Sequence, residues 1–149
     1  MLFSKYTMRV YLLYGEKLMN NNVKSEEQEK KELIEKLKQE FDIVSDIDFN
    51  EFTIQEKLKQ HAFLMVRYGE CLERANYDLE KLKELKEKIT GERYHYYRFN
   101  YDEGLTKIEI EKYYLVKDEK ILKINNLIRL QKVKVDFFNI CCKAVDKMG

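Results

Sequence analysis

Two long stretches of this chain carry apolar side chains in alternating steps of three and four residues, and no proline interrupts them. The two rows of the first stretch are Ile54, His61, Tyr68, Ala75, Leu82 and Ile89, and Leu58, Met65, Leu72, Leu79 and Lys86. Such spacing places side chains on one helical face and is typical of a coiled-coil seam. Because proline breaks helices and glycine loosens them, a chain with no proline and five glycines is predicted to be all-α, with long helices.

The second stretch opens at Thr106, which forms a capping-box pattern with Glu109. Its seam positions are Ile110, Tyr114, Lys117, Ile121, Ile124, Ile128, Gln131, Val135, Phe138, Cys142 and Val145. Apolar residues beside the seam make the face wider than a dimer seam needs: Leu122, Leu127, Leu130, Val133 and Phe137. Two helices of similar length joined by a short segment should fold back on each other. We therefore predict a long antiparallel helical hairpin with a coiled-coil-like seam. Its wide apolar face is covered either by the N-terminal helices or by other copies of the chain, and we expect self-association.

Local signals set the expected boundaries of the hairpin. Thr53 and Glu56 form a second capping box, and Gly91 is the natural stop of a first helix over residues 53–90. The segment Glu92–Leu105 then forms the tip of the hairpin. We assign residues 52–149 to this domain.

The remaining residues, 1–51, are predicted to be an N-terminal helical extension with an acidic linker. Residues 2–19 form an apolar helix that stops at Asn20–Asn22, and Ser25 with Gln28 caps a short charged helix to about Glu40. In residues 41–52, acidic and apolar side chains alternate, which indicates a segment that packs loosely or docks on a partner, or else a short strand.

Charge and motif content exclude several classes of protein. The 28 basic and 27 acidic side chains nearly cancel, so any anion binding must come from a local patch. No Walker loop occurs, and His61 and His95 are too far apart for the usual metal or triad patterns. We predict that the protein is not an enzyme and uses no cofactor or metal.

The three cysteines, Cys71, Cys141 and Cys142, are odd in number and lack the spacing of a zinc site or a disulfide framework. Neighbouring Cys141 and Cys142 are either small apolar residues on the seam or a redox pair. The sequence contains no signal peptide pattern and no apolar run of the ~20 residues that a membrane span needs. We expect a soluble, cytoplasmic protein.

The tip allows two interpretations. It combines two arginines with five aromatic residues: Arg93 and Arg98, and Tyr94, Tyr96, Tyr97, Phe99 and Tyr101. Guanidinium groups bind phosphates and flat rings stack on bases, so this segment is a candidate single-strand nucleic-acid surface. Alternatively, the rings close the end of the hairpin, and the arginines pair with Glu92, Asp102 and Glu103.

The last thirty residues are also basic, since seven basic side chains against two acidic ones give residues 120–149 a local charge of +5. Such a stretch could follow a phosphate backbone. It could equally be a solvated helix face that meets an acidic face, such as residues 42–56, elsewhere in an assembly.

The order of these features resembles the UvsY family of phage recombination mediators. The resemblance covers about residues 52–145. It depends on an apolar–basic helix, Arg93, the pair Tyr96–Tyr97, a short glycine-containing segment, and a helix with Tyr114, Asp118, Ile121, Ile124, Leu130, Gln131, Val135 and Phe137.

The resemblance implies an all-helical, ring-like homo-oligomer that binds single-stranded DNA and contacts a phage recombinase and a phage single-strand-binding protein. It would help the recombinase to load onto coated DNA in the cytoplasm of the infected cell. Arg93 matches one basic position of the family's DNA-binding segment, and Gly91 replaces the other. Lys88 and Arg98 are the nearest substitutes, so the expected DNA-binding residues are Lys88, Arg93, Tyr94, Tyr96, Tyr97 and Arg98.

A second interpretation needs no nucleic acid. A non-catalytic helical adaptor or a chaperone-like oligomer would have the same long helices and wide apolar face. The tip is the feature that separates the two, because a scaffold does not need so many rings and arginines in one short segment.

Overall fold

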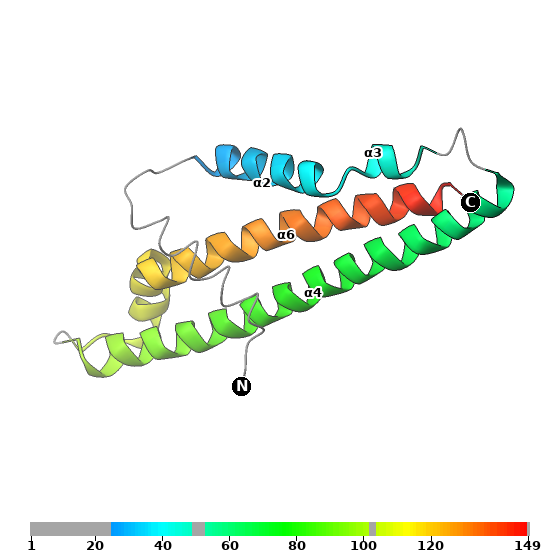
Figure 1. Cartoon of the computed structure of the whole chain (residues 1–149). Helices are drawn as coiled ribbons and strands as arrows, with labels where there is room; N and C mark the ends of the chain where they lie inside the picture. Colours follow the sequence, from blue (N-terminus) through cyan, green and yellow to red (C-terminus); the bar gives the residue numbers. More distant parts are fainter. Residues whose placement is uncertain (1–24, 49–52, 102–103, 149) are drawn as a thin grey trace. The chain divides into compact units, whose positions relative to one another are not determined.

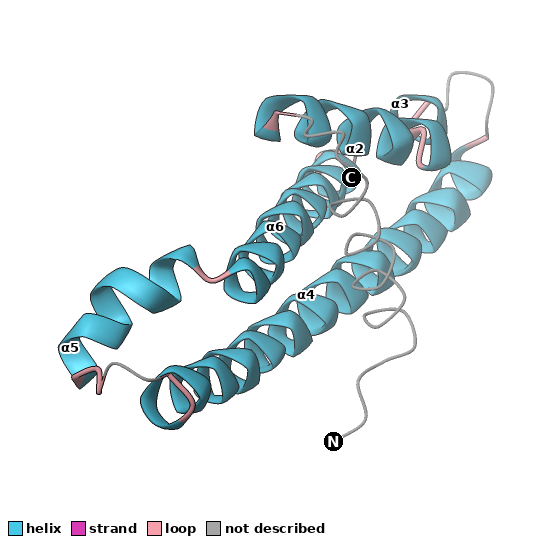
Figure 2. Cartoon of the chain, turned by 90° about the vertical axis from the view of Figure 1, so that its left-hand side faces the viewer, coloured by secondary structure: helices cyan, strands magenta, loops and turns pink. Residues whose placement is uncertain are grey.

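The computed structural model describes residues 25–48, 53–101 and 104–148, and the regular structure in these ranges is entirely helical, without a strand (Figures 1 and 2). The elements are α2 (Glu26–Glu40), α3 (Ile43–Asp46), α4 (Ile54–Phe99), α5 (Lys107–Glu109), the π-helix η1 (Ile110–Tyr114), the 3₁₀ turn η2 (Leu115–Lys117) and α6 (Glu119–Asp146). The prediction of an all-α fold is confirmed. The helix predicted over residues 2–19 and its stop at Asn20–Asn22 lie outside the described residues.

Helices α2 and α4 begin where the capping patterns predict. The hydroxyl of Ser25 accepts a hydrogen bond from the backbone N–H of Gln28 at 3.3 Å. At the start of α4, the N–H of Thr53 donates to the carboxylate of Glu56 at 2.9 Å, and the N–H of Glu56 donates to the Thr53 hydroxyl at 3.3 Å. These bonds satisfy amide groups that would otherwise lack partners in a first helical turn.

The prediction that Gly91 ends the first long helix is wrong. Helix α4 continues for about two turns beyond it, and the amide of Asn100 closes the last turn on the carbonyl of Tyr96 at 2.9 Å. One glycine in a helix interior costs only about 1 kcal/mol relative to alanine, so packing on either side can offset it. Most of the predicted tip is therefore helical, and the left-handed backbone lies later, at Gly104 with φ +57°.

The second long helix also differs from the prediction, because it is not continuous. The Thr106–Glu109 capping box is present, but the chain then passes through η1 and η2 and becomes extended at Asp118, with ψ 126°. One carboxylate oxygen of Asp118 accepts the N–H groups of Lys120 at 3.0 Å and Ile121 at 3.3 Å. Aspartate is a preferred N-cap residue, so Asp118 ends one helical segment and starts α6.

The chain divides into two compact units. Unit 1 consists of the described residues within Asp78–Arg129, and unit 2 consists of those within Lys24–Tyr77 and Leu130–Gly149. Both α4 and α6 contribute residues to each unit. The domain boundary expected near residue 51 stays a prediction.

In unit 2, α4 and α6 share an apolar core. Its buried residues include Leu64, Tyr68, Ala75, Leu130, Val135, Phe138, Cys141 and Val145. His61 Nε2 lies 3.0 Å from the carbonyl oxygen of Val145, and buried Gln131 donates from Nε2 to the carbonyl oxygen of Ala75 at 2.9 Å. His61 precedes Ala75 along α4, whereas its partner Val145 follows Gln131 along α6. These two segments of unit 2 therefore run in opposite directions.

The predicted seam of the first stretch is buried over only part of its length. Tyr68, Ala75, Leu79, Leu82 and Ile89 are buried. The first apolar seam residues are not, since Ile54, Leu58 and Met65 are 78%, 66% and 48% exposed. On α6 the predicted positions are buried except for Cys142, where the neighbouring Cys141 takes the buried place. The spacing thus identifies the inward face of α6 well, but not that of the first turns of α4.

Residues 41–48 of the predicted linker pack within unit 2 and form no strand. The ring of Phe41 meets Phe138 edge-on, with ring centroids 5.0 Å apart, and lies 6.2 Å from the ring of Tyr68. Asp46 in α3 accepts a hydrogen bond from the Tyr68 hydroxyl at 2.7 Å and lies 3.9 Å from the guanidinium of Arg67. An aromatic contact and an ion pair therefore fix this segment to α4 and α6.

Unit 1 has its own core, with side chains from α4, from the segment between Gly104 and α6, and from the start of α6. The buried residues include Leu79, Leu82, Ile89, Leu105, Ile110, Ile121, Ile124 and Leu127. Full burial of one such side chain stabilises a fold by about 1.5–3 kcal/mol. This core holds the last turns of α4 against η1, η2 and the start of α6, which positions the site described next.

Candidate nucleic-acid interface

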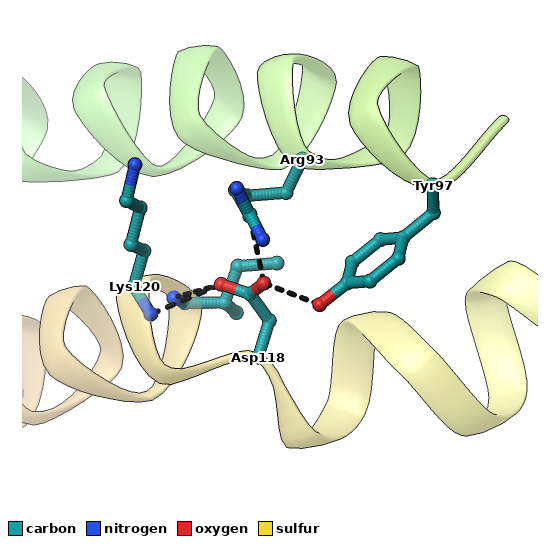
Figure 3. A network of polar contacts seen from close by, with 5 residues as sticks. Arg93, Tyr97, Asp118 and Lys120 are labelled. Carbon is teal, nitrogen blue, oxygen red and sulfur yellow. Dashed lines mark hydrogen bonds and ion pairs between the residues drawn. The ribbon is translucent and has the colours of Figure 1, made fainter. Parts of the chain in front are cut away.

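The carboxylate of Asp118 is the centre of a polar network in unit 1. Arg93 Nε and the Tyr97 hydroxyl both donate to its Oδ2 at 2.7 Å, while its Oδ1 caps α6 (Figure 3). The Asp118 side chain is only 3% exposed and that of Arg93 is 21% exposed. Arg93 and Tyr97 both come from the last turns of α4, one helical turn apart, so they approach Asp118 together.

The network changes the pKa of each member. Burial of Asp118 acts to raise its pKa, but hydrogen bonds from Tyr97 and Arg93 outweigh burial and lower the pKa below its ordinary value of 3.8. Burial and the hydrogen bond to Asp118 raise the pKa of Tyr97. Burial acts to lower the pKa of Arg93, yet the bond to Asp118 raises it. At neutral pH the site is therefore an ionised carboxylate held between a guanidinium and a phenol.

Arg93 has further contacts with the aromatic residues that follow it. Its guanidinium carbon lies 4.3 Å from the ring centre of Tyr96 and 5.2 Å from that of Tyr97. A guanidinium over a ring face is attracted by the ring's electron density. The charge of Arg93 is thus compensated within the fold by Asp118, a partner that the sequence interpretation of the tip did not include.

A cluster of tyrosine rings surrounds this network. The ring centres of Tyr97, Tyr101 and Tyr114 lie 5.4–5.9 Å from one another, and Tyr96 lies 5.4 Å from Tyr97. Edge-on and tilted pairs at these distances are favourable contacts between aromatic rings. Phe99 is 69% exposed, so the last turn of α4 also presents an aromatic ring to solvent.

The six residues expected to bind DNA differ in their accessibility. Lys88, Tyr96 and Arg98 are exposed, and Tyr94 is partly buried. Arg98 donates from Nη1 to the carbonyl of Leu105 at 2.8 Å, which uses one of the five donors of a guanidinium. Arg93 and Tyr97, by contrast, are engaged with Asp118. The structure therefore brings Arg93, Tyr96 and Tyr97 together and leaves Lys88 and Arg98 as the cations facing solvent among the six.

Residues outside the predicted set complete the site. A surface pocket of about 610 Å³ is lined by Tyr97, Leu105, Glu109, Tyr113, Tyr114 and Lys117. Tyr113 is in neither the predicted seam nor the predicted DNA-binding set, and Asp118 appears in the sequence analysis only as one of the residues that carry the family resemblance. The pattern of Asp118 followed by Ile121 is a usable signal for an N-cap before an apolar run.

The basic stretch after residue 120 belongs to both units. Lys120, Lys132, Lys143 and Lys147 are exposed. Lys134 is partly buried, and burial lowers the pKa of its ammonium group. The two interpretations of this stretch, a phosphate-binding surface and a solvated helix face, stay predictions.

His61 and the three cysteines belong to unit 2, whereas His95 belongs to unit 1, where its ring centre lies 4.6 Å from that of Phe99. His61 is partly buried, and its Nε2 lies 3.0 Å from the carbonyl oxygen of Val145. Burial raises the pKa of the Cys141 thiol to about 11, and burial also raises the pKa of Cys71 and Cys142. Among the residues that the structure describes, no three His, Cys, Asp or Glu side chains could share a metal ion.

Comparisons with known proteins add no relative, because no family model, no curated protein and no solved structure matches this chain. Within the described ranges, none of the helices is both long enough and apolar enough to cross a lipid bilayer.

Proposed function

We propose that this protein binds single-stranded DNA and acts as a recombination mediator, helping a phage recombinase to load onto DNA coated by single-strand-binding protein in the cytoplasm of the infected cell. It performs no chemical step. A mediator of this kind works by binding the strand in a form that favours the recombinase, which shifts the population of bound states. The mediator role rests on the resemblance to the UvsY family, and DNA binding rests also on the geometry of unit 1.

The observation that carries the DNA-binding part is the exposure of aromatic rings beside cations. Tyr96, Phe99, Tyr101 and Tyr113 are exposed in unit 1. Exposed Arg98 belongs to the same turn of α4 as Tyr96 and Phe99. Ring–base stacking contributes about 1–3 kcal/mol per base with little dependence on sequence, and cations supply the attraction to phosphate.

Assembly of several copies is part of this proposal, with each chain folded as an antiparallel hairpin with a coiled-coil-like seam. The opposite directions of α4 and α6 in unit 2 support the hairpin. Ile54, Leu58 and Met65 keep the heptad spacing although they are exposed, which supports a seam completed by another copy. Several weak DNA sites in one assembly would then bind a strand by avidity.

The alternative is a helical adaptor without nucleic-acid binding, and one observation favours it. Arg93 and Tyr97 are held by Asp118, so this part of the aromatic–basic segment has a structural role within unit 1. If the remaining rings are also structural, the exposed apolar seam would be the functional surface.

The two functions are separated by titrating a fluorescent dT oligonucleotide with the protein at several salt concentrations. The variant Lys88→Ala/Arg98→Ala removes the two exposed cations among the six residues expected to bind DNA, and Lys57→Ala/Lys59→Ala, which alters exposed lysines of unit 2, is the charge-matched control. For a single strand, each phosphate contact contributes about 0.7 to the slope of log affinity against log salt. We expect the site variant to bind more weakly and to flatten that slope by about 1.4.

The control variant should retain the affinity and the slope of the unaltered protein. Absence of binding even at low salt would refute the DNA-binding function and leave the adaptor. Equal binding by both variants would retain DNA binding but contradict this site.

A further inference from the structure

The pocket of unit 1 lies where irregular helix meets the last turns of α4. Glu109, Tyr113 and Lys117 follow one another at intervals of four residues along α5, η1 and η2, and Tyr114 lies beside them. Tyr97 and Leu105 complete the lining. The volume of about 610 Å³ lies within the usual range of small-ligand sites, roughly 300–1,000 Å³.

Residues 107–117, which supply four of the pocket's lining residues and form one wall of it, have an irregular helical backbone. Residues Ile110–Tyr114 form a π-helical turn, which widens the helix, and the 3₁₀ turn η2 then tightens it before the chain becomes extended at Asp118. π-Helical turns are rare and are frequent at functional sites. Here the irregular turn lies between the capping box of Thr106 and the fixed carboxylate of Asp118. Both ends of the wall are therefore anchored by hydrogen bonds.

The side chains of the pocket combine three kinds of contact. Tyr113 is 63% exposed, so its ring faces solvent, whereas the ring of Tyr114 is packed against Tyr97 and Tyr101. Oε2 of Glu109 accepts the N–H of Thr106 in the capping box at 3.4 Å, and the carboxylate has a second oxygen that can accept an N–H group from a ligand. Lys117 supplies an exposed cation. A flat ring with an N–H edge, attached to a phosphate, would satisfy all three.

We propose that this pocket receives one unstacked base of the bound single strand. The base stacks on the ring of Tyr113, an N–H group on its edge donates to Glu109, and the adjacent phosphate pairs with Lys117. The packed rings of Tyr97 and Tyr114, which line the pocket, and the Asp118 network hold its shape before the strand arrives. This inference rests on the proposed function, and it adds a specific subsite that the sequence did not indicate.

The test compares a dT oligonucleotide with an abasic oligonucleotide of the same length, which has the same phosphates but no rings. Tyr113→Ala should weaken binding of the dT strand by about fivefold to a hundredfold, the range expected for one stacked base. It should leave binding of the abasic strand unchanged. Tyr113→Phe, which keeps the ring, should bind the dT strand like the unaltered protein.

Two further variants separate the contacts. Lys117→Ala should weaken binding of both strands alike, because it removes a phosphate contact. Val116→Ala is the matched control, since Val116 is an exposed neighbour that does not line the pocket. Its affinity for both strands should not change. Thymidine monophosphate shows whether the pocket takes a free nucleotide or a base within a strand. It should bind far more weakly than the dT strand, because it lacks the strand's other phosphate contacts.

The outcomes distinguish this inference from the proposed function. If the unaltered protein binds neither strand, the DNA-binding function itself is refuted. If it binds the dT strand, but Tyr113→Ala binds it equally well or loses affinity for the abasic strand to the same degree, the base subsite is refuted and DNA binding remains.

Discussion

Replacing Asp118 by asparagine would remove the charge from the centre of the unit 1 network while keeping an oxygen that can cap α6. Breaking a fully buried ion pair by removing one partner costs about 3–5 kcal/mol, because the other charge stays buried. The Arg93 side chain is 21% exposed, so water reaches part of its guanidinium. We therefore expect Asp118→Asn to lower the free energy of unfolding by roughly 2–3 kcal/mol.

Asp118→Ala should cost more, because it also removes the hydrogen bonds to the amides of Lys120 and Ile121. An N-cap contributes about 1 kcal/mol, so the expected loss is roughly 3–4 kcal/mol. Since natural domains are stable by only about 5–15 kcal/mol, both losses are measurable by urea denaturation followed by helical circular dichroism. Asp136→Asn, at an exposed carboxylate of α6, is the control and should change stability by less than about 0.5 kcal/mol.

The stability difference between the unaltered protein and Asp118→Asn should also depend on pH. The pKa of Asp118 is lowered in the folded state, so the unfolded state binds a proton more readily. The stabilisation is therefore present above the ordinary pKa of 3.8 and is lost as the pH falls through the lowered pKa of the folded state. The difference between the unaltered protein and Asp118→Asn should be complete at pH 7 and shrink in acid.

A double-mutant cycle tests the assignment to Arg93. In the Arg93→Met background, Asp118→Asn should cost clearly less than in the unaltered protein, because the ion pair is already absent. The reasoning would be refuted if Asp118→Asn cost less than about 0.5 kcal/mol at pH 7, or if the two substitutions were simply additive.

Two further predictions concern stability away from the Asp118 network. Gly91→Ala should stabilise the protein by about 0.5–1 kcal/mol, because the position is inside α4 and an added Cβ meets nothing within 4 Å. Gly104→Ala should instead destabilise it by about 1 kcal/mol, because φ is +57° there. Urea denaturation checks both, and a loss of stability in Gly91→Ala would contradict the continuous helix. Tyr68→Phe should remove the 2.7 Å hydrogen bond to Asp46 and speed amide hydrogen exchange in α3, whereas unchanged exchange would show that this bond does not hold α3 in place.

The features that could be predicted from sequence are those that depend on neighbours along the chain. The capping residues Ser25, Thr53 and Thr106 identify three helix starts, because a side chain that accepts an N–H group three residues later needs no tertiary contact. The apolar spacing of α6 likewise identifies its buried face. Of the candidate site, the sequence indicates the aromatic–basic segment, which unit 1 places in one cluster with Tyr114.

Features that depend on distant residues could not be predicted in this way. Gly91 is an ordinary local signal for the end of a helix, yet α4 continues through it. The segment after Thr106 has the local pattern of a continuous helix, yet η1 and η2 interrupt it. The pairing of Arg93 with Asp118, 25 residues later, stabilises the last turns of α4 and the break before α6 together. No local pattern contains that partner.

The sequence by itself determined that this protein is helical, where α2, α4 and α5 begin, and which short segment carries the rings and cations. These properties follow from backbone capping and from the helical period, which act over a few residues. Only the tertiary structure decided that Arg93 and Tyr97 bind Asp118, that Ile54 and Leu58 stay exposed, and that Tyr113 and Lys117 line a pocket. The reason is physical: burial and ion pairing are set by which surfaces meet in space, and spacing along one helix does not determine its partner.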